Sequence, residues 1–189
     1  MYKRQTEYRV VERSAALVDV SENGEAMVRI SETGIVEFFS VADGSGIAAY
    51  DLGSTIVKAK RLSPLVDTYA LLDNNNNLLF VKTDYIVDFD GGQRRLSPKL
   101  SFPFSNRSIP LGPLDNFDVQ LADDDLVIAT VRGSQVSLTR FKNVEIGYRL
   151  SGSAQVTLAS TVQAQEVFLG PRNQWIYLLS KSGEIDVLG

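Results

Sequence analysis

The sequence predicts an all-β protein of the β-propeller type, built from four repeated antiparallel sheets of about 50 residues each. Turn residues recur at Gly34, Asp84, Gly133 and Gly183, at intervals of 50, 49 and 50 residues. A strand of alternating apolar and polar residues follows each turn, and no segment shows the 3.6-residue period of a helix. A propeller blade is a small antiparallel sheet, and kelch-type blades repeat with a period of about 50 residues.

Each repeat contains at least three predicted strands, joined by linkers rich in the Asn, Asp, Gly and Pro that tight turns require. A fourth strand is predicted at 46–53 and at 144–152. In the second repeat, Pro98 and Pro103 reduce the corresponding stretch to an edge strand or a loop. The repeats form a single domain, with units at about 14–53, 66–105, 115–152 and 163–189. The alternative is a β-sandwich of many short strands, whose strands need not recur at one spacing.

The two chain ends leave two arrangements open. The fourth unit has no outermost strand, and residues 7–12 resemble the stretch that precedes this unit. Residues 7–12 complete the last sheet if the chain closes a four-bladed ring, which removes the exposed sheet edge. If the chain is instead a slice of a larger propeller, the edge at 184–188 stays open and favours a homo-oligomer.

The composition excludes several classes of function. The chain has 19 basic and 23 acidic residues, so it gains little from binding the phosphates of a nucleic acid. It has no histidine and no cysteine, which excludes Ser-His-Asp triads, thiolate nucleophiles and the commonest metal ligands. We therefore expect no catalytic residue, no metal site and no cofactor, and we expect that the protein is not an enzyme. No run of residues is apolar enough to cross a membrane.

Three motifs have structural interpretations. The glycine-rich stretch at 44–49 is followed by a strand and not by the helix that a dinucleotide site needs, so its glycines are expected in a turn. Asp and Asn residues at 73–77 have calcium-loop spacing, but Leu78 stands where that loop requires Gly, which favours a hairpin turn. Trp175 begins an apolar stretch and is expected to pack between sheets.

One basic stretch is a candidate binding surface. Its members are Arg94, Arg95, Lys99 and Arg107. Such a cluster can bind an anion or the acidic surface of a protein partner. The structural alternative is a charged sheet edge that prevents another strand from adding to it.

Two segments resemble known propeller blades. ALVDVSENGEAMVRISETGIVEFFSVADG, at 16–44, and EVFLGPRNQWIYLLSKSGEIDVLG, at 166–189, look like WD40-like blades of the bacterial type. The second segment is similar to the large extracytoplasmic region in the permease subunit of phosphate ABC transporters of some gammaproteobacteria. That resemblance implies a periplasmic domain of an inner-membrane protein, held in the membrane only by flanking segments.

Two function classes follow from this resemblance. In the first, the chain is a non-catalytic module for phosphate uptake, and its partner is the phosphate-binding protein or another transporter subunit. In the second, it is a propeller scaffold for protein–protein interaction unrelated to transport, such as an outer-membrane assembly lipoprotein. The sequence that flanks the chain in its gene would separate the two classes.

Overall fold

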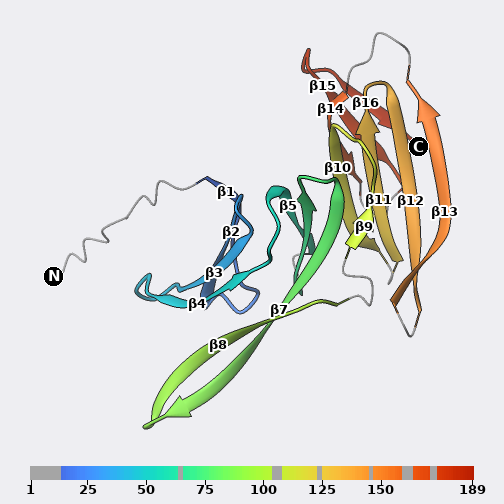
Figure 1. Cartoon of the computed structure of the whole chain (residues 1–189). Coiled ribbons are helices and arrows are strands. Elements are labelled where there is room, and N and C mark those ends of the chain that lie inside the picture. Colours follow the sequence, from blue (N-terminus) through green and yellow to red (C-terminus); the bar gives the residue numbers. More distant parts are fainter. Residues whose placement is uncertain are drawn as a thin grey trace.

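A computed structural model describes residues 14–63, 66–103, 108–122, 125–144, 147–158, 164–170 and 174–189. These residues form β-strands and turns, with no helix among them, which confirms the predicted all-β class. The strands make four antiparallel sheets, as the sequence predicts (Figure 1). Residues 7–12 lie outside the described residues.

The sheets follow one another along the chain. The first contains β1 (Ala15–Val20), β2 (Ala26–Ser31), β3 (Ile35–Ser40) and β4 (Gly46–Asp51). The second contains β5 (Ile56–Ser63), β6 (Val66–Asp73), β7 (Asn77–Asp90) and β8 (Gln93–Ser101), and the short strand β9 (Ser108–Pro110) pairs with β7. The third contains β10 (Asn116–Ala122), β11 (Asp125–Arg132), β12 (Gln135–Val144) and β13 (Gly147–Thr157). The fourth contains β14 (Ala164–Leu169), β15 (Ile176–Ser180) and β16 (Ile185–Leu188).

The sheets are stacked like propeller blades and not like the layers of a sandwich. The first strand of each sheet lies beside the first strand of the next, so that β1 contacts β5, β5 contacts β10, and β10 contacts β14. Within each sheet the strands follow in chain order away from this inner position. We call β1, β5, β10 and β14 the inner strands. β2 and β15 are both the second strand of their sheets, as the repeat predicts.

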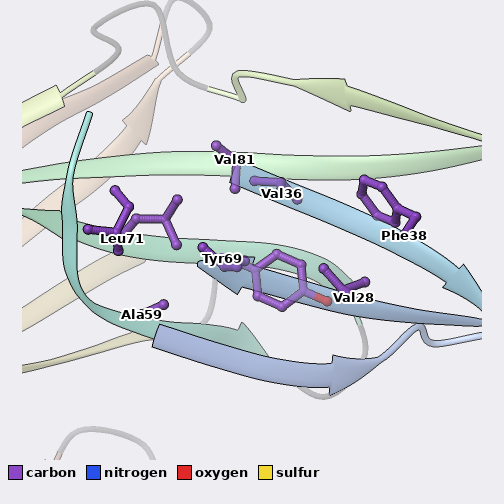
Figure 2. Close-up of a cluster of buried hydrophobic side chains, with 9 residues drawn as sticks. Val28, Val36, Phe38, Ala59, Tyr69, Leu71 and Val81 are labelled. Atoms are coloured by element: carbon purple, nitrogen blue, oxygen red, sulfur yellow. The ribbon is translucent and has the colours of Figure 1, made fainter. Parts of the chain in front are cut away.

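Three apolar clusters hold successive sheets together. The first lies between the first two sheets, where Val28, Val36 and Phe38 face Ala59, Tyr69, Leu71 and Val81 (Figure 2). The second joins the second and third sheets, and includes Phe80, Phe117 and Ile128. The third joins the third and fourth sheets, and includes Val131, Val167 and Leu178. Each cluster forms because strand alternation presents one apolar row to each side of a sheet.

The structure corrects the predicted register of the second repeat. Asp84 is not a turn, because β7 runs through it and pairs with β8, placing Asp84 opposite Lys99. The turn equivalent to Gly34 lies at 74–76, where Asn76 has a left-handed backbone with φ of 61°. The second sheet therefore begins at Ile56, whereas the expected unit begins at residue 66.

The stretch around Pro98 is the outermost strand of its sheet, as the prolines predict.

The polar run at 73–77 is a hairpin turn, as predicted. The Asp73 carboxylate accepts hydrogen bonds from the backbone N–H groups of Asn75 and Asn77, both at 2.8 Å. A carboxylate that bonds its own turn in this way is typical of an Asx turn. Its oxygens therefore hold the link between β6 and β7.

The prediction for Trp175 is wrong. Its side chain is 46% exposed and precedes β15. The neighbouring Ile176 points toward the third sheet, where it packs against the third cluster. Because side chains alternate along extended backbone, the Trp175 side chain lies on the face of the fourth sheet that points away from the third sheet. There its ring covers Gly189.

The turn at Gly34 provides a test of the packing between the first sheet and the β4–β5 connection. Gly34 has φ of +83°, and a Cβ there would collide with the Ser54 carbonyl oxygen. Gly24 has φ of +71° but open space around it. We expect Gly24→Ala to lower the free energy of unfolding by about 1–2 kcal/mol, the cost of left-handed backbone for alanine. Gly34→Ala should cost about 1–3 kcal/mol more, since it adds a steric clash. Equal losses in urea denaturation would show that Ser54 does not lie against Gly34.

Candidate functional site

Three of the four predicted basic residues lie on one hairpin. β7 and β8 form an arm that extends beyond the rest of the second sheet (Figure 1). Arg94, Arg95 and Lys99 are exposed residues of β8. Arg107 lies outside the described residues.

The arm and the first sheet enclose a pocket of about 660 Å³. Its lining comes from the turns of the first sheet, from the start of β4 and from β8, and includes Val41, Ile47, Arg94, Arg95 and Leu96. The pocket therefore has both apolar and charged groups on each side: Val41, Ile47 and Glu25 from the first sheet, and Leu96 with the two arginines from the arm. It is the place where the structure brings two of the predicted residues together.

Two polar contacts fix the arm against the first sheet. Arg94 Nη2 donates to both carboxylate oxygens of Glu25 at 2.8 Å. The Tyr50 hydroxyl donates to the Pro98 carbonyl at 2.6 Å. Since Arg94 is paired, Arg95 is the pocket cation without an ion pair among the described residues.

Apolar side chains continue the pocket toward the end of the arm. Val87 stands opposite Leu96 and Phe89 stands opposite Arg94, so these four side chains share one face of the hairpin. Phe89 is 67% exposed and Val87 is also exposed. Large apolar side chains grouped on a surface are typical of protein-binding sites. We call Val41, Val87, Phe89, Arg95 and Leu96 the hairpin surface, to which Arg95 belongs because it lines the pocket, although it stands opposite Asp88 on the other face of the hairpin.

Lys99 does not belong to this surface. It stands opposite Asp84, on the face of the hairpin that also carries Arg95, and Asp84 also pairs with Lys82 at 2.7 Å. Lys99 does not line the pocket. The predicted cluster is thus divided between two faces of one hairpin, with Arg94 on one face and Arg95 and Lys99 on the other.

A second polar group, on the inner strands, was missed by sequence reasoning. Lys58 and Lys60 of β5 reach across to the third and fourth sheets. Lys58 Nζ lies 3.2 Å from Glu166, and Lys60 Nζ lies 2.8 Å from Asp118. On the other side of β5, Arg61 bonds Asp19 at 3.0 Å and Asp67 at 2.6 Å. These residues are far apart in sequence, so no local spacing reveals them.

Asp118 connects three sheets. One of its carboxylate oxygens accepts from Lys60 of the second sheet, and the other accepts from the backbone N–H of Leu169 in the fourth sheet at 2.7 Å. Lys60 also lies over the rings of Phe117 and Phe168, with distances of 5.9 and 5.4 Å to the ring centres. These charged residues of the inner strands therefore pair with one another and fix the sheets relative to one another.

Titratable groups are also buried at the junction of the first two sheets. Burial raises the pKa of Asp67, although the Glu22 N–H and the Arg61 guanidinium favour its ionised form. Burial likewise raises the pKa of Tyr69 and of Tyr85, so both phenols stay protonated near neutral pH. A phenol with a raised pKa is a poor general base at neutral pH.

The part of the chain that the structure describes has no group of three acidic, His or Cys residues arranged to hold a metal ion. None of its segments forms a helix long and apolar enough to cross a membrane.

Comparison with known proteins identifies the fold. The chain is similar to the β-propeller domain of Cps50 (Swd1) from Myceliophteria thermophila, with a TM-score of 0.58 and 10% sequence identity. The similarity covers 90% of this chain and 51% of that one, so the chain spans about half the length of the solved propeller. This confirms the predicted β-propeller architecture. A scan against protein families and a search of curated proteins found no match.

Proposed function

We propose that the chain is a non-catalytic protein-interaction module that binds its partner through the hairpin surface. The observation that carries this proposal is the exposed apolar face of the β7–β8 arm beside a pocket lined by Arg95, which forms no ion pair with any residue that the structure describes. Apolar side chains surrounded by polar ones favour a protein partner over a small polar ligand. The partner segment that fits this surface has an apolar side chain for the pocket and a carboxylate for Arg95.

We further propose that this module belongs to the periplasmic region of a phosphate ABC transporter permease. The support is the resemblance of the segments at 16–44 and 166–189 to that family. In this setting the partner is the phosphate-binding protein or another subunit of the transporter. The module would influence how the binding protein docks and would not contact phosphate itself.

Site-specific photo-crosslinking in the native host tests the proposal. A photoreactive amino acid is placed at Val41, at Phe89, or at the control positions Leu150 and Val156, which are exposed residues of β13. We expect a crosslinked protein at Val41 and Phe89 and none at the controls. Equal crosslinking at all four positions would contradict the hairpin surface as the binding site.

A charge reversal tests whether the pocket residue Arg95 takes part in binding. Arg95→Glu should weaken the crosslink from position 89 several-fold, because it places a carboxylate where the partner's own carboxylate binds. Lys99→Glu is the matched control and should leave the crosslink unchanged, because Lys99 does not line the pocket. If both reversals act equally, net charge and not the pocket determines binding.

The identity of the crosslinked protein tests the transport role separately. Mass spectrometry should identify the phosphate-binding protein or a transporter subunit, and Phe89→Ala should slow uptake of labelled phosphate. A crosslinked protein unrelated to phosphate uptake would remove the transport role and keep the hairpin surface.

A further inference from the structure

Within the part of the chain that the structure describes, the first and fourth sheets each have one face that no other sheet covers. The three apolar clusters join the first sheet to the second, the second to the third and the third to the fourth. Among the described residues, none of these clusters joins the fourth sheet to the first. We call the two uncovered faces the end faces.

The end face of the fourth sheet is apolar. Val167 and Leu178 point toward the third sheet, so their strand neighbours point away from it. Tyr177 pairs with Val187 and Leu179 pairs with Ile185, which places these four residues together on the end face, beside Trp175. Ile185 is 67% exposed and Val187 is 52% exposed.

The end face of the first sheet is also apolar. Met27 stands opposite both Val20 and Phe39, and Val18 follows on the same face. Val18 is 58% exposed, and Val20 is exposed as well.

The charges on the end face of the first sheet are already paired. Arg29 forms an ion pair with Glu37 on the neighbouring strand, and its guanidinium lies 5.6 Å from the centre of the Phe39 ring. A partner can cover this face without leaving a buried charge unpaired, which would be strongly destabilising.

The middle sheets show what normally covers such a face. In β11 the successive residues Leu126, Val127, Ile128 and Ala129 are all buried, because the second and fourth sheets cover the two sides of the third. At each junction in this chain, one face of a sheet packs on the facing side of the next sheet along the chain. The matching partner for the fourth sheet is therefore a sheet with the surface of the first.

We propose that two copies of this chain associate head to tail, with the end face of the fourth sheet in each copy packed on the end face of the first sheet in the other. Two such contacts related by a two-fold axis close a ring, so neither end face stays open. The size is consistent, because one chain covers 51% of a solved propeller domain. This association uses sheet faces and not the strand edge at 184–188, and it does not involve the hairpin surface.

Sedimentation of the purified chain at micromolar concentrations tests the proposal. We expect a species of about twice the chain mass of 20.8 kDa. Ile185→Lys and Val18→Lys, one on each end face, should each raise the dissociation constant at least tenfold, which corresponds to a loss of about 1.4 kcal/mol. Leu150→Lys is the control: this side chain is 59% exposed but lies on β13, away from both end faces.

Each alternative outcome would overturn the proposal. A wild-type monomer at these concentrations excludes association through the end faces. Loss of the dimer in only one of the two end-face variants indicates pairing of like faces, and species larger than a dimer indicate an open chain of copies. A dimer that persists in both variants indicates pairing at the strand edge. Circular dichroism of each variant confirms that it remains folded, and Val187→Lys replaces Ile185→Lys if that variant does not fold.

Discussion

Replacing Phe38 with alanine should lower the free energy of unfolding by about 3–5 kcal/mol. The side chain is fully buried between the first two sheets (Figure 2). Its ring makes edge-to-face contacts with Tyr50 and Tyr85, with ring centres 6.0 and 6.3 Å apart. Each such contact adds about 0.5–1.5 kcal/mol to the apolar burial. Urea denaturation followed by tyrosine and tryptophan fluorescence measures the loss.

The matched control is Phe89→Ala, which removes the same side chain from an exposed position on the arm. We expect a change within about 0.5 kcal/mol, the usual range for surface substitutions. Similar losses for the two variants would show that Phe38 is not in a packed junction, and that the first two sheets do not meet as described.

Replacing Asp118 with alanine should lower the free energy of unfolding by about 2–3 kcal/mol. Removal of one partner from a buried ion pair costs about 3–5 kcal/mol, and this pair is partly accessible to solvent, which reduces the value. The variant leaves Lys60 without its carboxylate and the backbone N–H of Leu169 without its acceptor. The loss should appear in both thermal and urea denaturation.

Asp90→Ala is the control for this variant, because Asp90 is exposed near the end of the arm. It should change the stability by less than about 0.5 kcal/mol. Asp118→Asn should retain part of the stability, because the amide oxygen can still accept one of the hydrogen bonds. If Asp118→Ala is as mild as Asp90→Ala, the inner strands are not held together by this carboxylate.

The architecture could be predicted because strand alternation and turn residues are local properties of the sequence. The glycines at 34, 133 and 183 mark the turns between the second and third strands of three sheets, and each has a positive φ. Asn76 performs the same role in the second sheet. The regular spacing of the repeats instead predicts this turn at Asp84. In the structure β7 runs through Asp84 as one continuous strand, so no turn forms there.

The inner polar group could not be predicted because its members come from different sheets. Lys60 and Asp118 are 58 residues apart in sequence, and only the stacking of β5 beside β10 brings them together. The basic cluster was predicted from its composition. The division of the cluster, with Arg94 on one face and Arg95 and Lys99 on the other, depends on the pairing register of β7 and β8, which the misplaced turn at Asp84 concealed.

The stacking of inner strands is the central feature of this structure, and carbodiimide coupling tests it most directly. The reagent joins a lysine amine to a carboxylate only when the two are in contact. Peptide mass spectrometry should find Lys60 joined to Asp118 and Lys58 joined to Glu166, with the exposed pair Lys82–Asp84 as the positive control. If Lys82 couples to Asp84 while Lys58 and Lys60 couple to other carboxylates or to none, β5 does not lie against β10 and β14, and the described propeller packing is wrong.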